Sequence, residues 1–280
     1  MHDLKFRVDA AKCVKCGLCV KDCPRKLIHL DRDGDGLPCI PQDKTERCMR
    51  CQHCMAVCPA GALSIRGLDP AKASPLRSLD LPSGEQMRNL LRSRRSVRSF
   101  VRENVDPATI DSLLKALANV PTGCNARELS FTCFRTVESM DRLRAGFLKL
   151  VEEHKDGGRM IPRWIAIPAI ALRRGKYDEF FRGAPHMLVV SADERLPDAT
   201  TPDTDVHAAM AYFDMLAAAE GLGTCWCGYL PLISREIPEV RHLLGLSPNA
   251  PFYTMYFGKP AVRYMRTVQR DDEARIIYRD

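Results

Sequence analysis

The sequence has no apolar stretch approaching the roughly 18 residues of a transmembrane helix, so it predicts no membrane span. Its formal charge of +7 is not concentrated in a block of lysines and arginines, which disfavours a nucleic-acid-binding protein. The first residues, Met1 to Arg7, lack the apolar segment of a secretory signal. We therefore expect a chain that remains in a reducing cytoplasm.

Cysteine, by contrast, is abundant and unevenly placed. Eight of the 13 cysteines form two runs of the pattern C-x2-C-x2-C-x3-C-P, from Cys13 to Pro24 and from Cys48 to Pro59. In bacterial two-cluster proteins each run supplies three ligands to one 4Fe-4S cluster and its last cysteine to the other cluster. The predicted ligand sets are Cys13, Cys16, Cys19 and Cys58 for one cluster, and Cys48, Cys51, Cys54 and Cys23 for the second.

Zinc sites and disulfides are the two alternative roles for these cysteines. Zinc sites usually show two separated C-x2-C pairs, which fits two complete four-cysteine runs poorly. A disulfide framework is typical of secreted chains, and the sequence offers no secretory signal. We therefore favour two 4Fe-4S clusters.

The segment between the cysteine runs predicts a β-hairpin. Apolar residues 27–30 and 37–40 flank an Asp-Gly turn. Asp31, Asp33 and Asp35 also match the start of a calcium loop, but Gln42 replaces the glutamate expected at its end, so calcium is disfavoured. Cys39 is expected to be a small buried residue of the second strand.

Proline density indicates where the chain divides. Three Pro-containing turns fall between Asp69 and Gly84, which is typical of a connector. We predict an N-terminal domain at 1–67, a linker at 68–83 and a second domain at 84–280.

The second domain alternates helical and strand patterns. Helices are expected at about 85–92, 107–120, 139–154 and 203–221, and strands at 129–134, 185–191 and 252–257. Segment 157–183 fits either a lid over an active site or a dimer contact. Gly221-x-Gly223 follows a helix rather than a strand, so it is not a dinucleotide-binding motif. We expect Gly221 to end the helix and the glycines to permit close backbone approach.

Two basic stretches could bind a phosphate. Arg94, Arg95 and Arg98 surround Ser96, and their forked donors suit a phosphate, although a solvated basic helix end is an equal alternative. Arg263 and Arg266 follow the last strand and offer a second anion site. Cys124 and Cys133 are expected to pack rather than react.

Residues 85–268 resemble the nitroreductase family of FMN-dependent flavoproteins. The resemblance rests on four stretches in order: Arg94-Arg95-Ser96-x-Arg98-x-Phe100, Pro121-Thr-Gly-x-Asn125, Ala218 to Gly228, and Gly258-x-Pro260 followed by Arg263 and Arg266. The N-terminal part resembles a bacterial two-cluster ferredoxin. Together these resemblances imply an α+β fold with a central, mainly antiparallel sheet flanked by helices, preceded by a small ferredoxin-like domain.

The resemblance also implies a set of FMN contacts. Arg94, Arg95, Ser96, Arg263 and Arg266 would lie near the FMN phosphate, and Arg98 near the flavin or its ribityl chain. Pro121, Thr122, Gly123 and Asn125 would follow the ribityl and pyrimidine edge, and Trp226, Cys227 and Gly228 would pass the flavin N5. Cys227 departs from the family, where relatives often have an aliphatic or acidic residue. No catalytic side chain is expected, because the flavin carries the chemistry.

The function implied is an FMN-dependent oxidoreductase of anaerobic metabolism. Two clusters would relay single electrons to FMN, which would reduce a small organic acceptor, such as a nitroaromatic, by hydride transfer. The alternatives are an enoyl, quinone or dehalogenating reductase of the same fold, and an electron carrier or redox sensor without a small substrate. The implied partners are the acceptor, an external ferredoxin or NAD(P)H as donor, and a second copy of the chain in a homodimer whose core holds helix 203–221.

Overall fold

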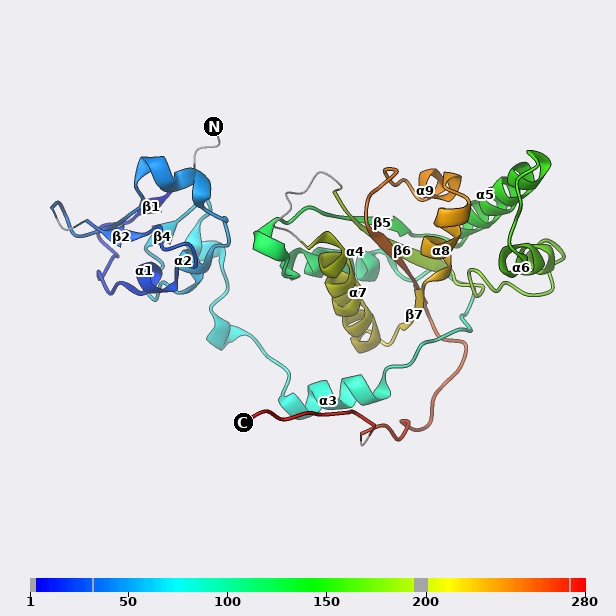
Figure 1. Ribbon diagram of the computed structural model, residues 1–280. Coiled ribbons are helices and arrows are strands. Elements are labelled where there is room, and N and C mark those ends of the chain that lie inside the picture. The colour runs from blue at the N-terminus through cyan, green and yellow to red at the C-terminus, as the bar shows by residue number, and fades with distance from the viewer. Residues whose placement is uncertain (1–3, 32, 194–200, 272) are drawn as a thin grey trace. The chain divides into compact units, whose positions relative to one another are not determined.

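The computed structural model describes residues 4–31, 33–193, 201–271 and 273–280 (Figure 1). Its contacts divide the chain into two units: residues up to Leu81 together with Cys124–Ala126, and residues Pro82–Gly123 with Arg127–Asp280. The division falls within the predicted linker, and residues 71–89 are all exposed. The exact domain limits 1–67, 68–83 and 84–280 stay a prediction.

The first unit consists of two small sheets and short helices. Its strands are β1 (Arg7–Val8), β2 (His29–Leu30), β3 (Pro38–Cys39) and β4 (Leu63–Ser64), and its α-helices are α1 (Leu18–Asp22) and α2 (His53–Ala56). Short 3-10 helices lie at η1 (Gln42–Arg47), η2 (Pro70–Lys72) and η3 (Leu76–Ser78). Both strand pairs, β1 with β4 and β2 with β3, are antiparallel, and a small core including Leu27, Ile28 and Leu63 packs beside them.

The predicted hairpin is confirmed, but the expectation that Cys39 is buried was wrong. β2 pairs with β3 in the register His29 to Cys39 and Leu30 to Pro38. Pro38 is buried and Cys39 is exposed, because successive strand residues point to opposite faces.

The second unit is built on one four-stranded sheet. Its strands are β5 (Leu129–Phe134), β6 (His186–Ala192), β7 (Gly223–Cys227) and β8 (Phe252–Gly258). They lie in the order β5-β6-β8-β7, and every neighbouring pair is antiparallel. The three predicted strands are confirmed within one residue at each end. Strand β7 was missed, because its short sequence begins at a glycine and directly follows the end of a helix.

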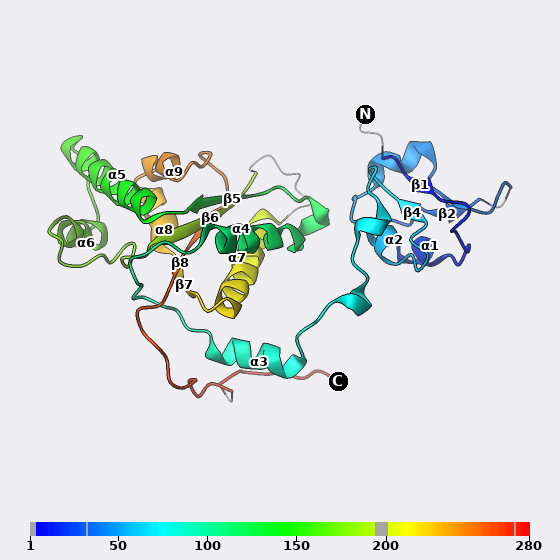
Figure 2. The ribbon, with the colours of Figure 1, turned by 180° about the vertical axis from the view of Figure 1, so that it is seen from behind.

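Helices cover both faces of this sheet (Figures 1 and 2). On one face lie α5 (Val137–Asp156), α6 (Arg163–Arg173), α8 (Tyr229–Glu236) and α9 (Glu239–Leu243); on the other lie α4 (Pro107–Ala116), its extension η4 (Leu117–Asn119), and α7 (Pro202–Ala219). Strand β6 contributes side chains to the apolar cluster on each face of the sheet. Met187 and Val189 belong to one cluster, and Leu188 and Val190 belong to the other. This alternation makes β6 the buried centre of the unit.

Local contacts fix the ends of three helices. The Ser83 hydroxyl accepts the Gln86 N–H, and the Gln86 side chain accepts the Ser83 N–H, which forms a capping box before α3 (Gly84–Ser93). Asp106 caps α4 by accepting the Thr109 N–H. Gly221 follows α7 with φ 73°, in the left-handed region that suits glycine at a helix end.

Close approach explains Gly223. A Cβ at this position would lie 2.6 Å from the Val97 side chain, which is closer than real atoms come. The backbone after α3 passes close to Gly223. Ser96 forms a parallel bridge to Thr224, and the Val97 N–H donates to the Thr224 carbonyl at 2.8 Å. The predicted role of these glycines in backbone approach is confirmed for Gly223.

Helix α3 contributes nothing to either apolar cluster, and none of its residues is buried. In both views it runs beside the C-terminal segment (Figures 1 and 2), and Arg92 joins the two through a paired contact with Asp271, with Nη2 to Oδ2 at 2.7 Å. Its apolar residues Met87 and Leu91 are exposed. The predicted helix is thus confirmed, while these two residues of its apolar face stay exposed within one chain.

Segment 157–183 contains helix α6. Ile165 and Ala169 pack into the core, whereas Trp164, Ile167 and Ile170 are exposed. Whether this exposed face serves as a lid or as a dimer contact stays a prediction. Among the described residues, no helix combines the length and the apolar character that crossing a bilayer requires.

Candidate functional site

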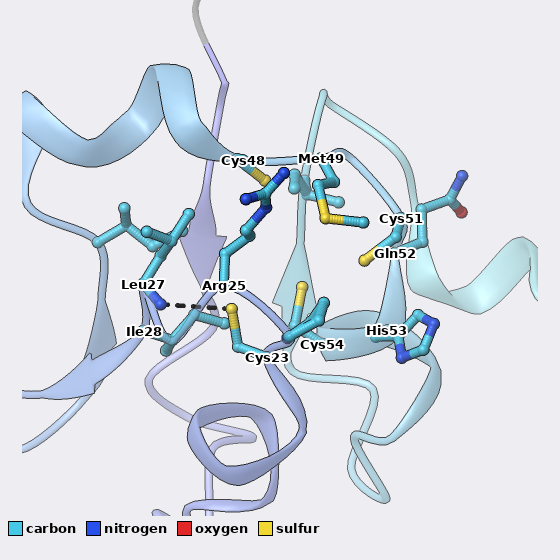
Figure 3. A pocket seen from close by; sticks show the side chains of 13 residues that line it. Cys23, Arg25, Leu27, Ile28, Cys48, Met49, Cys51, Gln52, His53 and Cys54 are labelled. Carbon is cyan, nitrogen blue, oxygen red and sulfur yellow. Dashed lines mark hydrogen bonds between the residues drawn. The ribbon is translucent and has the colours of Figure 1, made fainter. Parts of the chain in front are cut away.

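One cavity of the first unit is lined by cysteines from both runs. Its walls include Cys23 from the first run and Cys48, Cys51 and Cys54 from the second. Figure 3 shows their sulfur atoms around a shared space, with apolar Leu27 beside them. One of the two predicted ligand sets is therefore gathered around a single cavity.

A second cavity gathers the other four cysteines. Cys13, Cys16 and Cys19 line it together with Cys58 from the second run. The last cysteine of each run thus lies with the other run, which is the arrangement that two cubane clusters with exchanged ligands require.

The backbone bends in the same way in both runs. Lys15 and Arg50, at equivalent positions, each have φ 55°, and Gly17 and Gln52 have φ 72° and 63°. Non-glycine residues rarely adopt this left-handed conformation. Its recurrence at equivalent positions indicates that both runs require the same tight turn. The tight turn allows cysteines spaced by two residues to face one cavity.

Backbone N–H groups donate to cysteine sulfurs. The Leu27 N–H lies 3.4 Å from Cys23 Sγ, the Arg50 N–H 3.4 Å from Cys48 Sγ, and the Ala62 N–H 3.3 Å from Cys58 Sγ. Such contacts favour a sulfur that carries negative charge, and hydrogen bonds to sulfur help to set the potential of an iron–sulfur cluster.

Burial opposes ionisation of several of these thiols. It raises the pKa of Cys54 to about 12, and it also raises the pKa values of Cys19 and Cys48. Coordination to a metal cation reverses this preference and removes the thiol proton. The residues therefore fit a cluster.

The acidic loop between the runs is a turn. The Asp35 carboxylate accepts the Leu37 N–H at 2.8 Å, which closes the turn locally. Within the ranges that the structure describes, no three His, Cys, Asp or Glu side chains are arranged to hold a single metal ion.

In the second unit, a buried carboxylate joins α7 to β7 and to the start of the arginine-rich stretch. Asp214 accepts hydrogen bonds from the Thr224 hydroxyl and from Trp226 Nε1, the latter at 3.0 Å. Arg94 Nη1 lies 3.3 Å from its second oxygen. Asp214 is 5% exposed, so these contacts form in a largely water-free setting. Together they hold Arg94 and Trp226 near each other.

Arg95 has a donor with no partner. Its Nε is buried and lacks a hydrogen bond, while its Nη2 donates to the Arg92 carbonyl. A buried guanidinium donor without an acceptor is costly, so it suits a site that an anionic oxygen would complete. The unpartnered Nε of Arg95 supports the predicted contact of this residue with a phosphate.

A cavity of about 310 Å³ opens at the end of β7. Four predicted cofactor residues line it: Arg98, Trp226, Cys227 and Gly228. Its other walls are Glu179, Phe180, Arg182, Cys225, Tyr229, Leu232 and Tyr256. Residues far apart in the sequence thus meet around a space within the size range of small-ligand pockets.

The thiol of Cys227 is held by a hydrogen bond. Its Sγ lies 2.7 Å from the Tyr256 hydroxyl, which itself donates to the Phe180 carbonyl. Because that hydroxyl proton is committed, the thiol is the donor to Tyr256. Burial and the neighbouring Cys227 raise the pKa of Tyr256 well above its ordinary value. Cys227 is therefore packed in a buried chain of hydrogen bonds that runs through Tyr256 to the Phe180 carbonyl.

Positive charge reaches this cavity from two arginines. Burial raises the pKa of Cys225, and the charges of Arg98 and Arg182 oppose that shift only in part. Tyr229 donates to Glu179 at 2.8 Å, and this bond raises the pKa of Tyr229. The cavity is thus cationic on the side of its arginines.

Comparison with known proteins identifies both units. The model of the nitroreductase family matches residues 91–259, and that of a 4Fe-4S dicluster domain matches residues 12–63. The chain belongs to the nitroreductase family. It is a nitroreductase-family oxidoreductase with an N-terminal 4Fe-4S dicluster domain, and the α+β fold expected from the sequence is confirmed.

Curated relatives match only short stretches. The methylamine utilization ferredoxin-type protein MauM of Methylophilus methylotrophus is 40% identical over 68 residues, covering 22% of this chain and 30% of that protein. NADH-quinone oxidoreductase subunit I 2 of Geobacter metallireducens is 35% identical over 71 residues, covering 24% of this chain and 54% of that protein. The chain thus spans from about a third to about half of the length of these relatives.

Solved structures match the fold of the nitroreductase unit. A nitroreductase with bound FMN from Bacteroides fragilis is 20% identical, with TM-score 0.51 and coverage of 69% of this chain and 99% of that chain. A nitroreductase with bound FMN from Desulfitobacterium hafniense is also 20% identical, with TM-score 0.50 and coverage of 68% and 97%.

Other residues predicted to bind FMN do not line the 310 Å³ cavity. Gly123 donates its N–H to both oxygens of buried Asp205 at 3.0 Å, and the Thr122 hydroxyl accepts the Arg127 N–H. Pro121, Asn125, Arg263 and Arg266 are not among its lining residues either, and the two arginines are exposed. Their roles toward FMN stay predictions.

Sequence reasoning missed several residues of the site. Asp214 has the clearest signal, since it is an acid within the otherwise apolar face of helix 203–221. Glu179, Arg182 and Tyr256 have no recognisable pattern, because the first two reach the cavity from the segment after α6 and Tyr256 from β8. Cys133 packs as expected, and burial raises its pKa to about 12, whereas Cys124 is exposed and the expectation that it packs was wrong.

Proposed function

We propose that this nitroreductase is an FMN-dependent enzyme that takes single electrons at two 4Fe-4S clusters and reduces a small organic acceptor, such as a nitroaromatic, by hydride transfer from the flavin. The observation that carries the proposal is the cavity that brings Arg98, Trp226, Cys227 and Gly228 together. Two solved nitroreductases of the same fold contain bound FMN. Protein side chains in such enzymes chiefly bind and orient.

The chain's own residues suit FMN. Arg95 offers a buried donor without a partner, and with Arg94 and Ser96 it would bind the phosphate, assisted by Arg263 and Arg266. Arg98 would contact the flavin from the cavity wall. A Cβ at position 228 would lie 3.1 Å from the Tyr253 hydroxyl, so glycine there keeps the backbone accessible.

Anaerobic purification tests the function directly. The protein should contain FMN and iron and should reduce a nitroaromatic with reduced ferredoxin or with NAD(P)H. A flavin-free protein would contradict the FMN assignment. A protein that retains flavin and clusters but reduces no organic acceptor with either donor would be an electron carrier.

We also propose that the enzyme is a cytoplasmic homodimer that binds neither nucleic acid nor membrane. The apolar residues Met87 and Leu91 of α3 are exposed, as are Tyr264 and Met265 after β8. Such a surface favours burial against a second copy. Sedimentation of the purified protein as a monomer at micromolar concentration would contradict the dimer.

The exchanged ligation predicts a specific effect of Cys58→Ala. We propose that Cys58 completes the cluster of Cys13, Cys16 and Cys19, because it lines their cavity. The substitution should lower the iron content from about eight to about four atoms per chain, since each cluster holds four irons. Anaerobic iron analysis with electron paramagnetic resonance checks this.

Cys39→Ala is the matched control, because Cys39 belongs to the same unit but is exposed and lines neither cluster cavity. It should keep the full iron content. Selective loss of the cluster held by Cys48, Cys51 and Cys54 in the Cys58 variant would refute the exchange, and zinc in place of iron would refute the clusters.

Arg95→Ala should weaken FMN binding about tenfold or more, because a charged hydrogen bond is worth about 1.5–3 kcal/mol. Arg88→Ala, which removes an exposed arginine of α3, should leave FMN affinity unchanged. Fluorescence titration of flavin-free protein measures both affinities. Equal affinities in the two variants would remove Arg95 from the phosphate site.

A further inference from the structure

A second cavity adjoins the one at the end of β7. It has a volume of about 340 Å³ and is lined by Arg98, Leu172, Gly175, Lys176, Tyr177, Asp178, Arg182 and Gly183. Arg98 and Arg182 line both cavities. The two guanidinium groups therefore stand at the boundary between the space proposed for the flavin and a separate space formed mainly by the segment after α6.

The loop that carries Arg182 is held firmly. The Asp178 carboxylate accepts the Phe181 N–H at 2.8 Å, the Gly183 N–H at 3.0 Å and Arg144 Nε at 3.0 Å. Arg144 also donates to the Ala184 carbonyl at 2.7 Å. These contacts clamp both ends of the loop, so Arg182 is presented on a fixed backbone.

The backbone of Arg182 itself is unusual. Its φ of 55° places a non-glycine residue in the left-handed region, which is costly and persists where the surroundings enforce it. Its guanidinium lies 5.5 Å from the centre of the Tyr177 ring and donates to the Tyr177 hydroxyl. Both the backbone and the side chain of Arg182 are therefore held in one orientation.

The second cavity has an excess of positive charge. Arg98, Arg182 and Lys176 contribute three cations. In the described part of the chain none of the three forms an ion pair, and the one acid in the wall, Asp178, is already paired with Arg144 at 3.0 Å. Forked guanidinium donors without a carboxylate partner are suited to bind one.

We propose that this second cavity is the subsite for a carboxylate on the acceptor, with Arg182 and Lys176 as its specificity-determining residues. The proposal rests on the proposed function, because it assumes that an acceptor is reduced beside Arg98. The enzyme would then prefer small acceptors that carry a negative charge over neutral ones of the same shape.

The test compares 4-nitrobenzoate with the neutral 4-nitrobenzamide by calorimetry on oxidised holoenzyme. We expect 4-nitrobenzoate to bind about tenfold or more tightly than the amide, as expected for charge-assisted hydrogen bonds. Arg182→Gln and Lys176→Gln should each reduce this preference, and FMN content should not change. Arg174→Gln is the control, since Arg174 is exposed and lines neither cavity.

Several results would overturn the subsite. These are equal affinities for the two probes in the wild-type protein, an undiminished preference in both Gln variants, or the same loss of preference in the Arg174 control. Loss of FMN from the Arg182 variant would make Arg182 a flavin ligand instead. Because calorimetry requires no turnover, a protein that binds 4-nitrobenzoate selectively but never reduces it would refute the proposed function and leave the anion site standing.

Discussion

Removal of residues 1–67 is expected to abolish turnover with a protein electron donor while FMN binding and reduction by dithionite persist. We propose that a low-potential ferredoxin, or another donor of single electrons, reduces the clusters and that these feed the flavin. Without the clusters, electrons from the protein donor would not reach the flavin. The expected effect is therefore loss of donor-dependent turnover, measured anaerobically beside the full-length enzyme.

The truncated chain should fold, because the deleted part contributes little to the second core. None of residues 66–96 is buried, and the buried apolar positions resume at Val97. Unchanged FMN content and an unchanged thermal transition of the nitroreductase unit are the controls. If the truncated protein turned over with the donor at the full-length rate, direct flavin reduction, for example by NAD(P)H, would be the better account.

Much of the cluster unit could be predicted from cysteine spacing. The pattern C-x2-C-x2-C-x3-C specifies which thiols can share a cluster, because the first three ligands lie within one turn of chain and the fourth comes from the other run. The cavities group Cys23 with the second run and Cys58 with the first, as the exchange requires. Cys39 was assigned to the wrong side, since a two-residue strand gives too little alternation to identify its buried face.

Fewer residues of the site in the nitroreductase unit could be predicted from the sequence. Capping residues such as Ser83 and Asp106 act on their immediate neighbours, so helix ends followed from local pattern. Asp214 pairs with Arg94, and Arg182 shares a cavity with Arg98. No local pattern encodes neighbours so far along the chain. Strand β7 was missed for the same reason, because the strand that stabilises it, β8, lies far along the chain.

Asp214→Ala should destabilise the nitroreductase unit strongly and impair FMN binding. The substitution leaves Trp226 Nε1 and the buried Thr224 hydroxyl without their acceptor and frees Arg94 from its partner. Removing one member of a buried charged pair costs about 3–5 kcal/mol. Because the Arg94 side chain is still 29% exposed, we expect the lower end of that range, about 3 kcal/mol.

Asp111→Ala provides the contrast, since Asp111 pairs with Arg135 at 3.7 Å on the surface and such pairs contribute about 0–1 kcal/mol. In a unit of this size, about 3 kcal/mol corresponds to a fall in melting temperature of roughly 6–12 °C. Differential scanning calorimetry measures both variants, and flavin titration reports whether β7 still shapes the cavity. Asp214→Asn should lie between them, because an amide keeps an acceptor for Trp226 but loses the charge that holds Arg94. If Asp214→Ala were no less stable than Asp111→Ala, the buried carboxylate would not be what joins α7, β7 and Arg94.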